Sequence, residues 1–233
     1  MILTSSGNFV DPFELKEQDV LIQDIACSLA GQPRFSGHTG TTYSVAEHSV
    51  ITLCSLVSNC SIILLKPETL KQALMHDAPE AYISDIPGPV KESINKKYDN
   101  AIQNIEEEIW KVIASKYNLP IRLKKEVLLA DKEALAGELV TFFSEGATVL
   151  KDQLKYKGTI NHLYEIINKA IEDFNDITDE HFLKSRTYYF LSDFFRILIP
   201  NVYSESIDLS MEPLSKEDAE YLFLETWKLL NLM

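Results

Sequence analysis

Residues 73–82 of this 233-residue chain read Ala-Leu-Met-His-Asp-Ala-Pro-Glu-Ala-Tyr. Behind an apolar run they place three groups that bind cations or transfer protons: His76, Asp77 and Glu80. The apolar residues have helical spacing, which predicts a buried helix after Pro67 that presents His76 and Asp77 near its end. Burying a carboxylate costs several kcal/mol unless it is paired or coordinated. A divalent cation would offset that cost if the chain supplies further ligands elsewhere.

Length and composition limit the class of protein. The length predicts one large domain, or one domain with an extension, and the hydrophobic content of 45% is enough for a sizeable core. The net charge of −13 argues against binding to nucleic-acid polymers or anionic membranes, although a small phosphorylated substrate is compatible with it. No leader peptide, long apolar run or metal-knuckle cysteine spacing is visible. These features predict a soluble, cytoplasmic protein.

The spacing of apolar residues predicts an all-α fold. Residues 1–18 show no clear periodicity, and the two Gly and one Pro of residues 32–40 predict a loop. The last predicted helix has an apolar stripe that would pack on the body of the protein or on a second copy of the chain. The predicted helices are 19–30, 45–57, 67–77, 102–112, 121–145, 160–174, 179–199 and 216–231.

Two of these helices carry polar side chains that need an explanation. Ser44 and Glu47 have the spacing of a capping box, which opens a helix and places His48 in its first turn. Asp131 falls on an apolar stripe, where an acid needs a partner. The alternative for His48 is a core histidine whose hydrogen bonds are satisfied locally. The stripe beside Asp131 consists of Val127, Leu128, Leu135, Leu139 and Phe142.

His48, His76, Asp77 and Asp131 are therefore four candidate metal ligands. Two imidazoles and two carboxylates would make a mixed nitrogen and oxygen site for a divalent metal such as Mn, Co, Fe or Zn. Such a site would leave coordination positions for water.

The order His, His-Asp, Asp along a helical chain resembles the HD-domain metal-dependent phosphohydrolases. The fuller pattern is similar to the branch that includes bacterial deoxynucleoside 5′-monophosphatases and phage deoxyadenosine triphosphatases. The resemblance covers about residues 19–146 and implies an HD-domain helical bundle over residues 1–146. Residues 147–233 would then form a C-terminal helical extension packed on the core or on a second subunit. The pattern consists of Arg34-Phe35, His38, residues 43–49 (YSVAEHS), 74–82 (LMHDAPEAY) and 84–87 (SDIP).

The resemblance also implies roles for individual residues. His48, His76, Asp77 and Asp131 would bind the metal. Glu80 would act as an acid or base or orient the attacking water, with Asp85 nearby. Asp85 has the alternative of a simple turn or cap residue. Because Pro79 cannot donate a backbone hydrogen bond, the helix should kink or end there, so a regular turn between His76 and Glu80 is not assured.

Substrate contacts are expected from the loop at 32–40 and from Lys91. The resemblance implies that Arg34 contacts phosphate, which suits its planar, permanently charged fork; the alternative is a structural ion pair with an acid. Phe35 could stack on a base or fill the core. His38 and Lys91 are further candidates for phosphate contact.

The function implied by the resemblance is hydrolysis of a deoxynucleotide with a divalent metal, with additional Mg as an option. Residues 34–48 look closer to the phage triphosphatases than to the monophosphatases, which favours dATP. A triphosphate needs further cations for its distal phosphates, and the candidates are His38, Lys91, Lys132 or a second metal. The alternatives are a deoxynucleoside 5′-monophosphatase, a phosphodiesterase for cyclic or signalling nucleotides, and a helical binding module without turnover.

Overall fold

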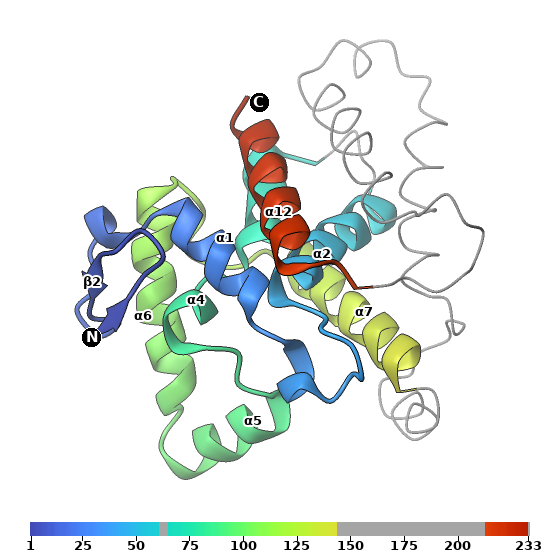
Figure 1. The fold of residues 1–233 in the computed structure, drawn as a ribbon, viewed down its shortest axis with the longest axis horizontal. Coiled ribbons are helices and arrows are strands. Elements are labelled where there is room, and N and C mark those ends of the chain that lie inside the picture. The colour runs from blue at the N-terminus through green and yellow to red at the C-terminus, as the bar shows by residue number, and fades with distance from the viewer. Residues whose placement is uncertain (61–64, 144–212, 233) are drawn as a thin grey trace.

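The computed structural model describes residues 1–60, 65–143 and 213–232, and these residues confirm the all-α prediction. Two-residue strands at Ile2–Leu3 (β1) and Phe9–Val10 (β2) pair as a small antiparallel hairpin, which the sequence did not predict. Within the described residues, no helix is both long and apolar enough to cross a membrane. The α-helices are α1 (Ile22–Gly31), α2 (Val45–Asn59), α3 (Pro67–Met75), α4 (Glu80–Ile83), α5 (Gly88–Lys97), α6 (Ala101–Lys116), α7 (Lys125–Phe142) and α12 (Lys216–Leu232) (Figure 1).

Helix α2 is the centre of the fold. All its residues from Val45 to Ser58 are buried, as expected for a helix that is packed on every side. It contacts α1, α3, α7 and α12. The predicted capping box is present at its start: the Glu47 N–H donates to Ser44 Oγ, and the Ser44 N–H donates to the Glu47 carboxylate. This cap fixes where α2 begins and therefore where His48 lies.

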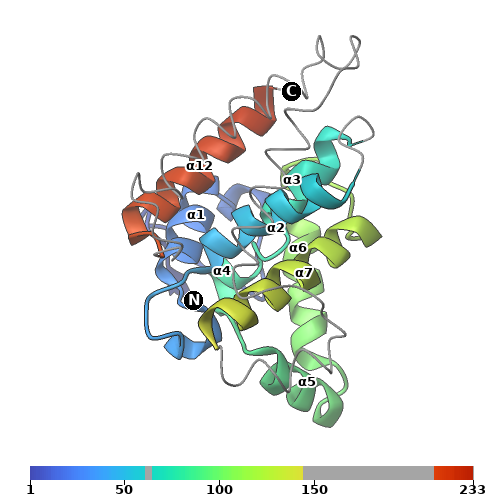
Figure 2. The same ribbon diagram turned by 90° about the vertical axis from the view of Figure 1, so that its right-hand side faces the viewer.

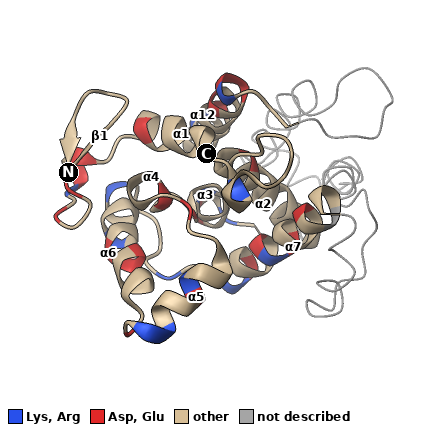
Figure 3. Ribbon diagram, turned by 60° about the horizontal axis from the view of Figure 1, so that its bottom comes forward, with Lys and Arg blue, Asp and Glu red and all other residues tan. Residues whose placement is uncertain are grey.

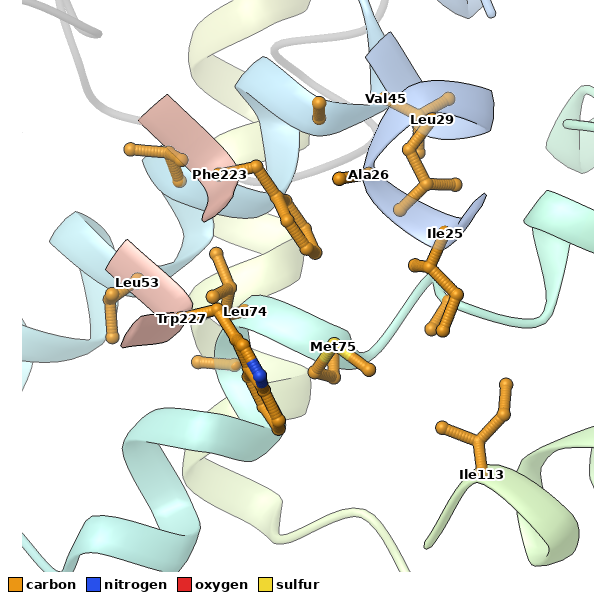
Figure 4. Close-up of a cluster of buried hydrophobic side chains, with 14 of the residues drawn as sticks. Ile25, Ala26, Leu29, Val45, Leu53, Leu74, Met75, Ile113, Phe223 and Trp227 are labelled. Atoms are coloured by element: carbon orange, nitrogen blue, oxygen red, sulfur yellow. The ribbon is translucent and has the colours of Figure 1, made fainter. Parts of the chain in front are cut away.

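Helix α12 joins the core formed by the N-terminal half of the chain. Figures 1 and 2 both show it running beside α1, and it also contacts α2 and α3. Phe223 and Trp227 of α12 are buried in one cluster with Ile25 of α1 and Leu74 of α3 (Figure 4). The helices predicted at 160–174 and 179–199, and the domain boundary predicted after residue 146, lie outside the described residues.

The structure differs from the sequence prediction in two helices. Residues 88–97 form α5, which has no buried residue and packs on α6, so it lacks the apolar stripe that would have predicted it. In α7 the predicted stripe was partly wrong, because Leu128 is 43% exposed. Val127 is buried as predicted, and the buried line of α7 continues through the small residues Ala130 and Ala134, which let α7 pack closely against α2.

The segment at 73–82 is interrupted, as Pro79 predicted, but the helix ends earlier than the predicted residue 77. Helix α3 ends at Met75, His76 and Asp77 lie in the turn that follows, and the short helix α4 begins at Glu80. The N–H of Glu80 donates to the carbonyl of Asp77, which closes the turn. His76 and Asp77 are therefore held by a compact turn rather than by a continuous helix.

Candidate metal centre

The ligand atoms of His48, His76 and Asp131 lie within 4.8 Å of one another, and the Asp77 carboxylate lies beside both imidazoles. His48 comes from the first turn of α2, His76 and Asp77 from the turn after α3, and Asp131 from the second turn of α7. Helices α3 and α7 both contact α2, so the first turn of α2, the turn after α3 and the second turn of α7 come together. The packing of three segments therefore assembles the cluster.

The distances within the cluster match those between ligands of a common ion. The Nε2 atoms of His48 and His76 are 3.2 Å apart, and His48 Nε2 lies 3.1 Å from Asp131 Oδ1. Asp77 Oδ2 is 3.3 Å from His76 Nε2 and 3.5 Å from His48 Nε2, while His76 Nε2 and Asp131 Oδ1 are 3.7 Å apart. Ligands bonded to one ion at about 2.0–2.2 Å are separated by about 3–3.6 Å.

Hydrogen bonds on the far side of each imidazole define which nitrogen faces the cluster. His76 Nδ1 lies 2.8 Å from the carbonyl oxygen of Ala73, which can only accept, so Nδ1 carries a proton. His48 Nδ1 lies 2.5 Å from a carboxylate oxygen of Glu138 and donates to it. In the neutral imidazoles both Nε2 atoms then present lone pairs to each other and to two carboxylates. Three acceptors from His48, His76 and Asp131 within 4.8 Å of one another, with the Asp77 carboxylate beside both imidazoles, favour a cation between them, either a metal ion or a proton.

The electrostatics show the same requirement. Burial alone lowers the pKa of His76, but the carboxylates of Asp77 and Asp131 outweigh it and raise that pKa well above its usual value. Burial likewise works to raise the pKa of Asp77 and of Asp131, but the two imidazoles hold both pKa values far below the usual range. The cluster therefore retains two ionised carboxylates and attracts positive charge.

Glu138 supports the cluster, and the sequence analysis missed it. This carboxylate is fully buried on α7 and accepts hydrogen bonds from His48 Nδ1, from the Tyr43 hydroxyl at 3.0 Å and from Arg34 Nε at 3.1 Å. Burial works to raise its pKa, but the charges of Arg34 and His48 outweigh burial and keep the pKa below its usual value. Carboxylates in this position commonly orient metal-binding imidazoles. Glu138 lies two turns after Asp131 on the same helix face, a spacing that could have revealed it.

Arg34 lies beside the cluster but is already paired with two acids. In addition to the Glu138 contact, its Nη1 lies 3.6 Å from Asp77 Oδ2. These neighbours raise its pKa further even though burial works to lower it. The structural ion pair that the sequence left open is therefore present, and a phosphate contact by Arg34 stays a prediction.

Glu80 is buried next to the cluster with one oxygen unused. Its Oε1 lies 3.7 Å from Lys91 Nζ, whereas its Oε2 has no hydrogen-bond partner among the described residues. Burial, reinforced by the charges of Asp77 and Asp85, raises the pKa of Glu80 to about 9. Burial also raises the pKa of Asp85. Glu80 is thus a group that holds a proton at neutral pH beside four metal-ligand candidates.

Gln32, at the end of α1, fixes the segment that carries Glu80 and Asp85. Its side-chain Nε2 donates to the carbonyl of Glu80 at 3.0 Å, and its Oε1 accepts from the N–H of Asp85 at 2.8 Å. One amide therefore binds the backbone at the start of α4, at Glu80, and just after its end, at Asp85. The sequence gives no signal for this contact, because both partners are backbone groups about 50 residues away.

The remaining predicted substrate contacts are less close to the cluster. Phe35 is half-buried, in a left-handed backbone conformation (φ 54°), and its ring packs edge-on against Phe143 with centroids 5.2 Å apart. His38 is exposed, and no side-chain hydrogen bond or ion pair within the described residues joins it to the site. Lys91 lies closer, with its Nζ 2.6 Å from Glu106.

A cleft of about 900 Å³ opens on the cluster. Its walls come from α4, α5, α6, α7 and the loop between α6 and α7, and Figure 3 shows acidic and basic residues on both α6 and α7. Neither Arg34 nor Lys132 lines it. The lining residues are His76, Asp77, Pro79, Glu80, Lys91, Gln103, Glu106, Glu107, Trp110, Lys111, Ile121, Arg122, Leu123, Leu128 and Asp131.

The chain is similar to two curated bacterial proteins. It is 40% identical over 137 residues to the uncharacterized protein YfdR of Escherichia coli (strain K12), a match covering 59% of this chain and 69% of YfdR. It is 32% identical over 144 residues to the uncharacterized protein RCAP_rcc00048 of Rhodobacter capsulatus, covering 60% of this chain and 72% of that protein. No protein-family model matches the chain.

Proposed function

The chain belongs to the family of YfdR and RCAP_rcc00048, and we propose that its His and Asp cluster binds a divalent metal and hydrolyses a phosphate bond of a nucleotide. The resemblance to HD-domain phosphohydrolases, carried by the order of His48, His76-Asp77 and Asp131, supports this class of reaction. It also favours a deoxynucleotide, with dATP as the first candidate.

The observation that carries the proposal is the cluster of three acceptor atoms from His48, His76 and Asp131, with Asp77 beside both imidazoles. His48 and His76 each donate Nδ1–H away from the cluster, so both Nε2 lone pairs face inward, together with oxygens of Asp77 and Asp131. Two imidazoles with two carboxylates suit Mn, Co, Fe or Zn better than Ca or Mg, which prefer oxygen. A divalent ion held there supplies positive charge that polarises a phosphoryl oxygen and assists attack by water.

The residues around the cluster have separate proposed tasks. Glu138 orients His48 and sets its tautomer, and Gln32 fixes the backbone of Glu80 and Asp85. Glu80 lines the cleft beside the cluster and has one buried carboxyl oxygen without a hydrogen-bond partner among the described residues, so we assign it the task of orienting water or moving a proton to or from a reacting oxygen.

The test combines metal analysis with a nucleotide panel. The purified protein is stripped with a chelator, reloaded with Mn, Co, Zn or Mg, and supplied with dAMP, dADP, dATP and a set of cyclic and signalling nucleotides. We expect turnover only with bound metal, with dATP releasing triphosphate and deoxyadenosine. Release of one phosphate from dAMP alone would indicate a monophosphatase, and cleavage restricted to cyclic or signalling nucleotides a phosphodiesterase.

Variants separate metal binding from a general loss of structure. His76→Ala and Asp77→Ala should lose bound metal and turnover together, whereas the exposed His38→Ala control should retain both. Full turnover after chelation and dialysis would contradict a metal-dependent hydrolase. Bound metal without turnover on any nucleotide would favour the binding module.

A further inference from the structure

The end of the cleft formed by α6 and the following loop carries two basic residues, Lys111 and Arg122. Neither has a carboxylate within 4.0 Å among the described residues, whereas Lys91, the other base of the cleft, is paired with Glu106. Glu107 lies one turn before Lys111, but its carboxylate accepts a hydrogen bond from Gln103 at 2.9 Å instead. Both side chains are exposed to solvent, so in a chain with a net charge of −13 they leave two cations in the cleft open to an anionic ligand.

The loop that carries Arg122 is held in place from inside the protein. The fully buried side chain of Gln72 on α3 donates to the carbonyls of Pro120 (2.8 Å) and Arg122 (3.0 Å) and accepts from the N–H of Lys124 (3.1 Å). These three backbone groups make no helical hydrogen bonds, and the Gln72 side chain bonds them instead. Arg122 therefore projects from a fixed backbone, which lowers the entropic cost of binding a charged ligand.

Trp110 adds a second brace to the same loop. Its indole N–H donates to the carbonyl of Ile121 at 2.7 Å, and the ring itself is buried between α6 and the loop. Lys111 follows Trp110 directly on α6, so the brace also fixes the distance between the backbones of Lys111 and Arg122. The two cations thus extend from braced backbone positions on the same cleft.

We infer that Lys111 and Arg122 form a subsite for a second anionic group of the substrate, separate from the phosphate at the metal cluster. The inference rests on the proposed function, and it narrows the substrate to molecules with more than one phosphate, such as a nucleoside triphosphate. Lys111 and Arg122 take the place of the cations that the sequence suggested for the distal phosphates. Of those cations, His38 makes no side-chain contact with the site, Lys91 is paired with Glu106, and Lys132 does not line the cleft. Arg and Lys both donate several hydrogen bonds to phosphate oxygens.

Binding of inorganic phosphates tests the subsite without requiring turnover. Protein loaded with Mn is titrated with tripolyphosphate and with orthophosphate by calorimetry, and bound Mn is measured afterwards so that metal stripping is not counted as binding. We expect the double variant Lys111→Ala/Arg122→Ala to bind tripolyphosphate about 10- to 30-fold more weakly, because ion pairs made by exposed side chains are partly screened by solvent. Its affinity for orthophosphate should be unchanged.

The matched control is Lys116→Ala/Lys125→Ala, which removes two exposed lysines of α6 and α7 that do not line the cleft. This control should bind both anions as the wild type does. Tripolyphosphate binding that is equal in the Lys111/Arg122 double variant and the wild type would overturn the subsite. An equal loss of orthophosphate affinity would also overturn it, because the two cations would then serve the phosphate at the metal. Absence of turnover with every nucleotide would reject the hydrolase without affecting either binding result.

Discussion

The substitution Glu138→Gln should weaken metal binding although Glu138 is not a ligand. The carboxylate is fully buried and accepts from His48 and Tyr43 on one oxygen and from Arg34 on the other. An amide keeps the shape but offers only one acceptor oxygen. One side of the carboxylate must therefore be replaced by an N–H₂ group.

Each orientation of the amide has a defined cost. If the N–H₂ group faces His48, the imidazole must present Nδ1 as an acceptor and carry its proton on Nε2, where it blocks metal binding. If it faces Arg34, two donors meet and a buried guanidinium keeps only the more distant Asp77, at 3.6 Å. Loss of such a supporting partner usually lowers metal affinity about 10- to 100-fold, or about 1.4–2.7 kcal/mol. Breaking a buried ion pair usually costs about 3–5 kcal/mol of stability.

Two measurements distinguish these outcomes. Competition with a coloured chelator gives the metal affinity, and urea unfolding of the chelated protein gives the free energy of unfolding. Glu133→Gln is the matched control: it lies on the same helix, accepts from Ser55 and Asn59, and makes no contact with the cluster. Wild-type metal affinity together with wild-type stability in Glu138→Gln would refute the supporting role.

Three further predictions concern residues around the cluster. Burial raises the pKa of Glu80 to about 9 from 4.5, so the folded, metal-free protein holds a proton that the unfolded chain releases, and it should lose a few kcal/mol of stability as the pH rises from about 5 to 9. Glu80→Gln should flatten this pH dependence in urea unfolding and should slow turnover about 100-fold or more while the metal stays bound. Loss of the metal in this variant would instead make Glu80 a ligand. Gln32→Leu should lower kcat with bound metal unchanged, since it releases the backbone of Glu80 and Asp85, and an effect on KM alone would contradict this. His38→Ala should leave KM and kcat for dATP within about two-fold, because an exposed residue without contacts contributes little; a larger rise in KM would return His38 to the phosphate site.

The sequence predicts those parts of the fold that depend on local signals. The capping box at Ser44 and the proline at position 67 mark the starts of α2 and α3 correctly. Helix α5 has no buried residue and no apolar stripe, and the proline in its first turn was not enough to predict it. Leu128 was assigned to the core by its residue type, whereas the close approach of α7 to α2 selects small side chains such as Ala134.

The candidate site likewise contains residues that the sequence predicts and residues that it does not. Groups that would bind a metal are recognisable one by one, since an acid or histidine among apolar residues is unusual in any helix. Glu138 was missed because its need for partners is met by residues 90 to 104 positions away. Gln32 and Gln72 were missed for a related reason: each supports backbone groups whose position depends on the packing of other helices. The two glutamine contacts follow from the assembled fold and have no local pattern, whereas Glu138 has a local signal, its position two turns after Asp131 on one face of α7.

Metal binding and protonation compete for the same place in the cluster. With both Nδ1 atoms already donating, any proton taken up by His48 or His76 lands on Nε2, the atom that would bind the metal. The carboxylates that attract a divalent ion also raise the pKa of His76, and this effect outweighs burial, which lowers that pKa. The same carboxylates therefore also favour binding of a proton at Nε2. Metal affinity should therefore fall with decreasing pH, and binding should release protons. The hydrogen bonds that the two Nδ1 atoms donate to Ala73 and Glu138 leave this competition unchanged. They keep the Nδ1 protons in place, so the proton that metal binding releases comes from Nε2.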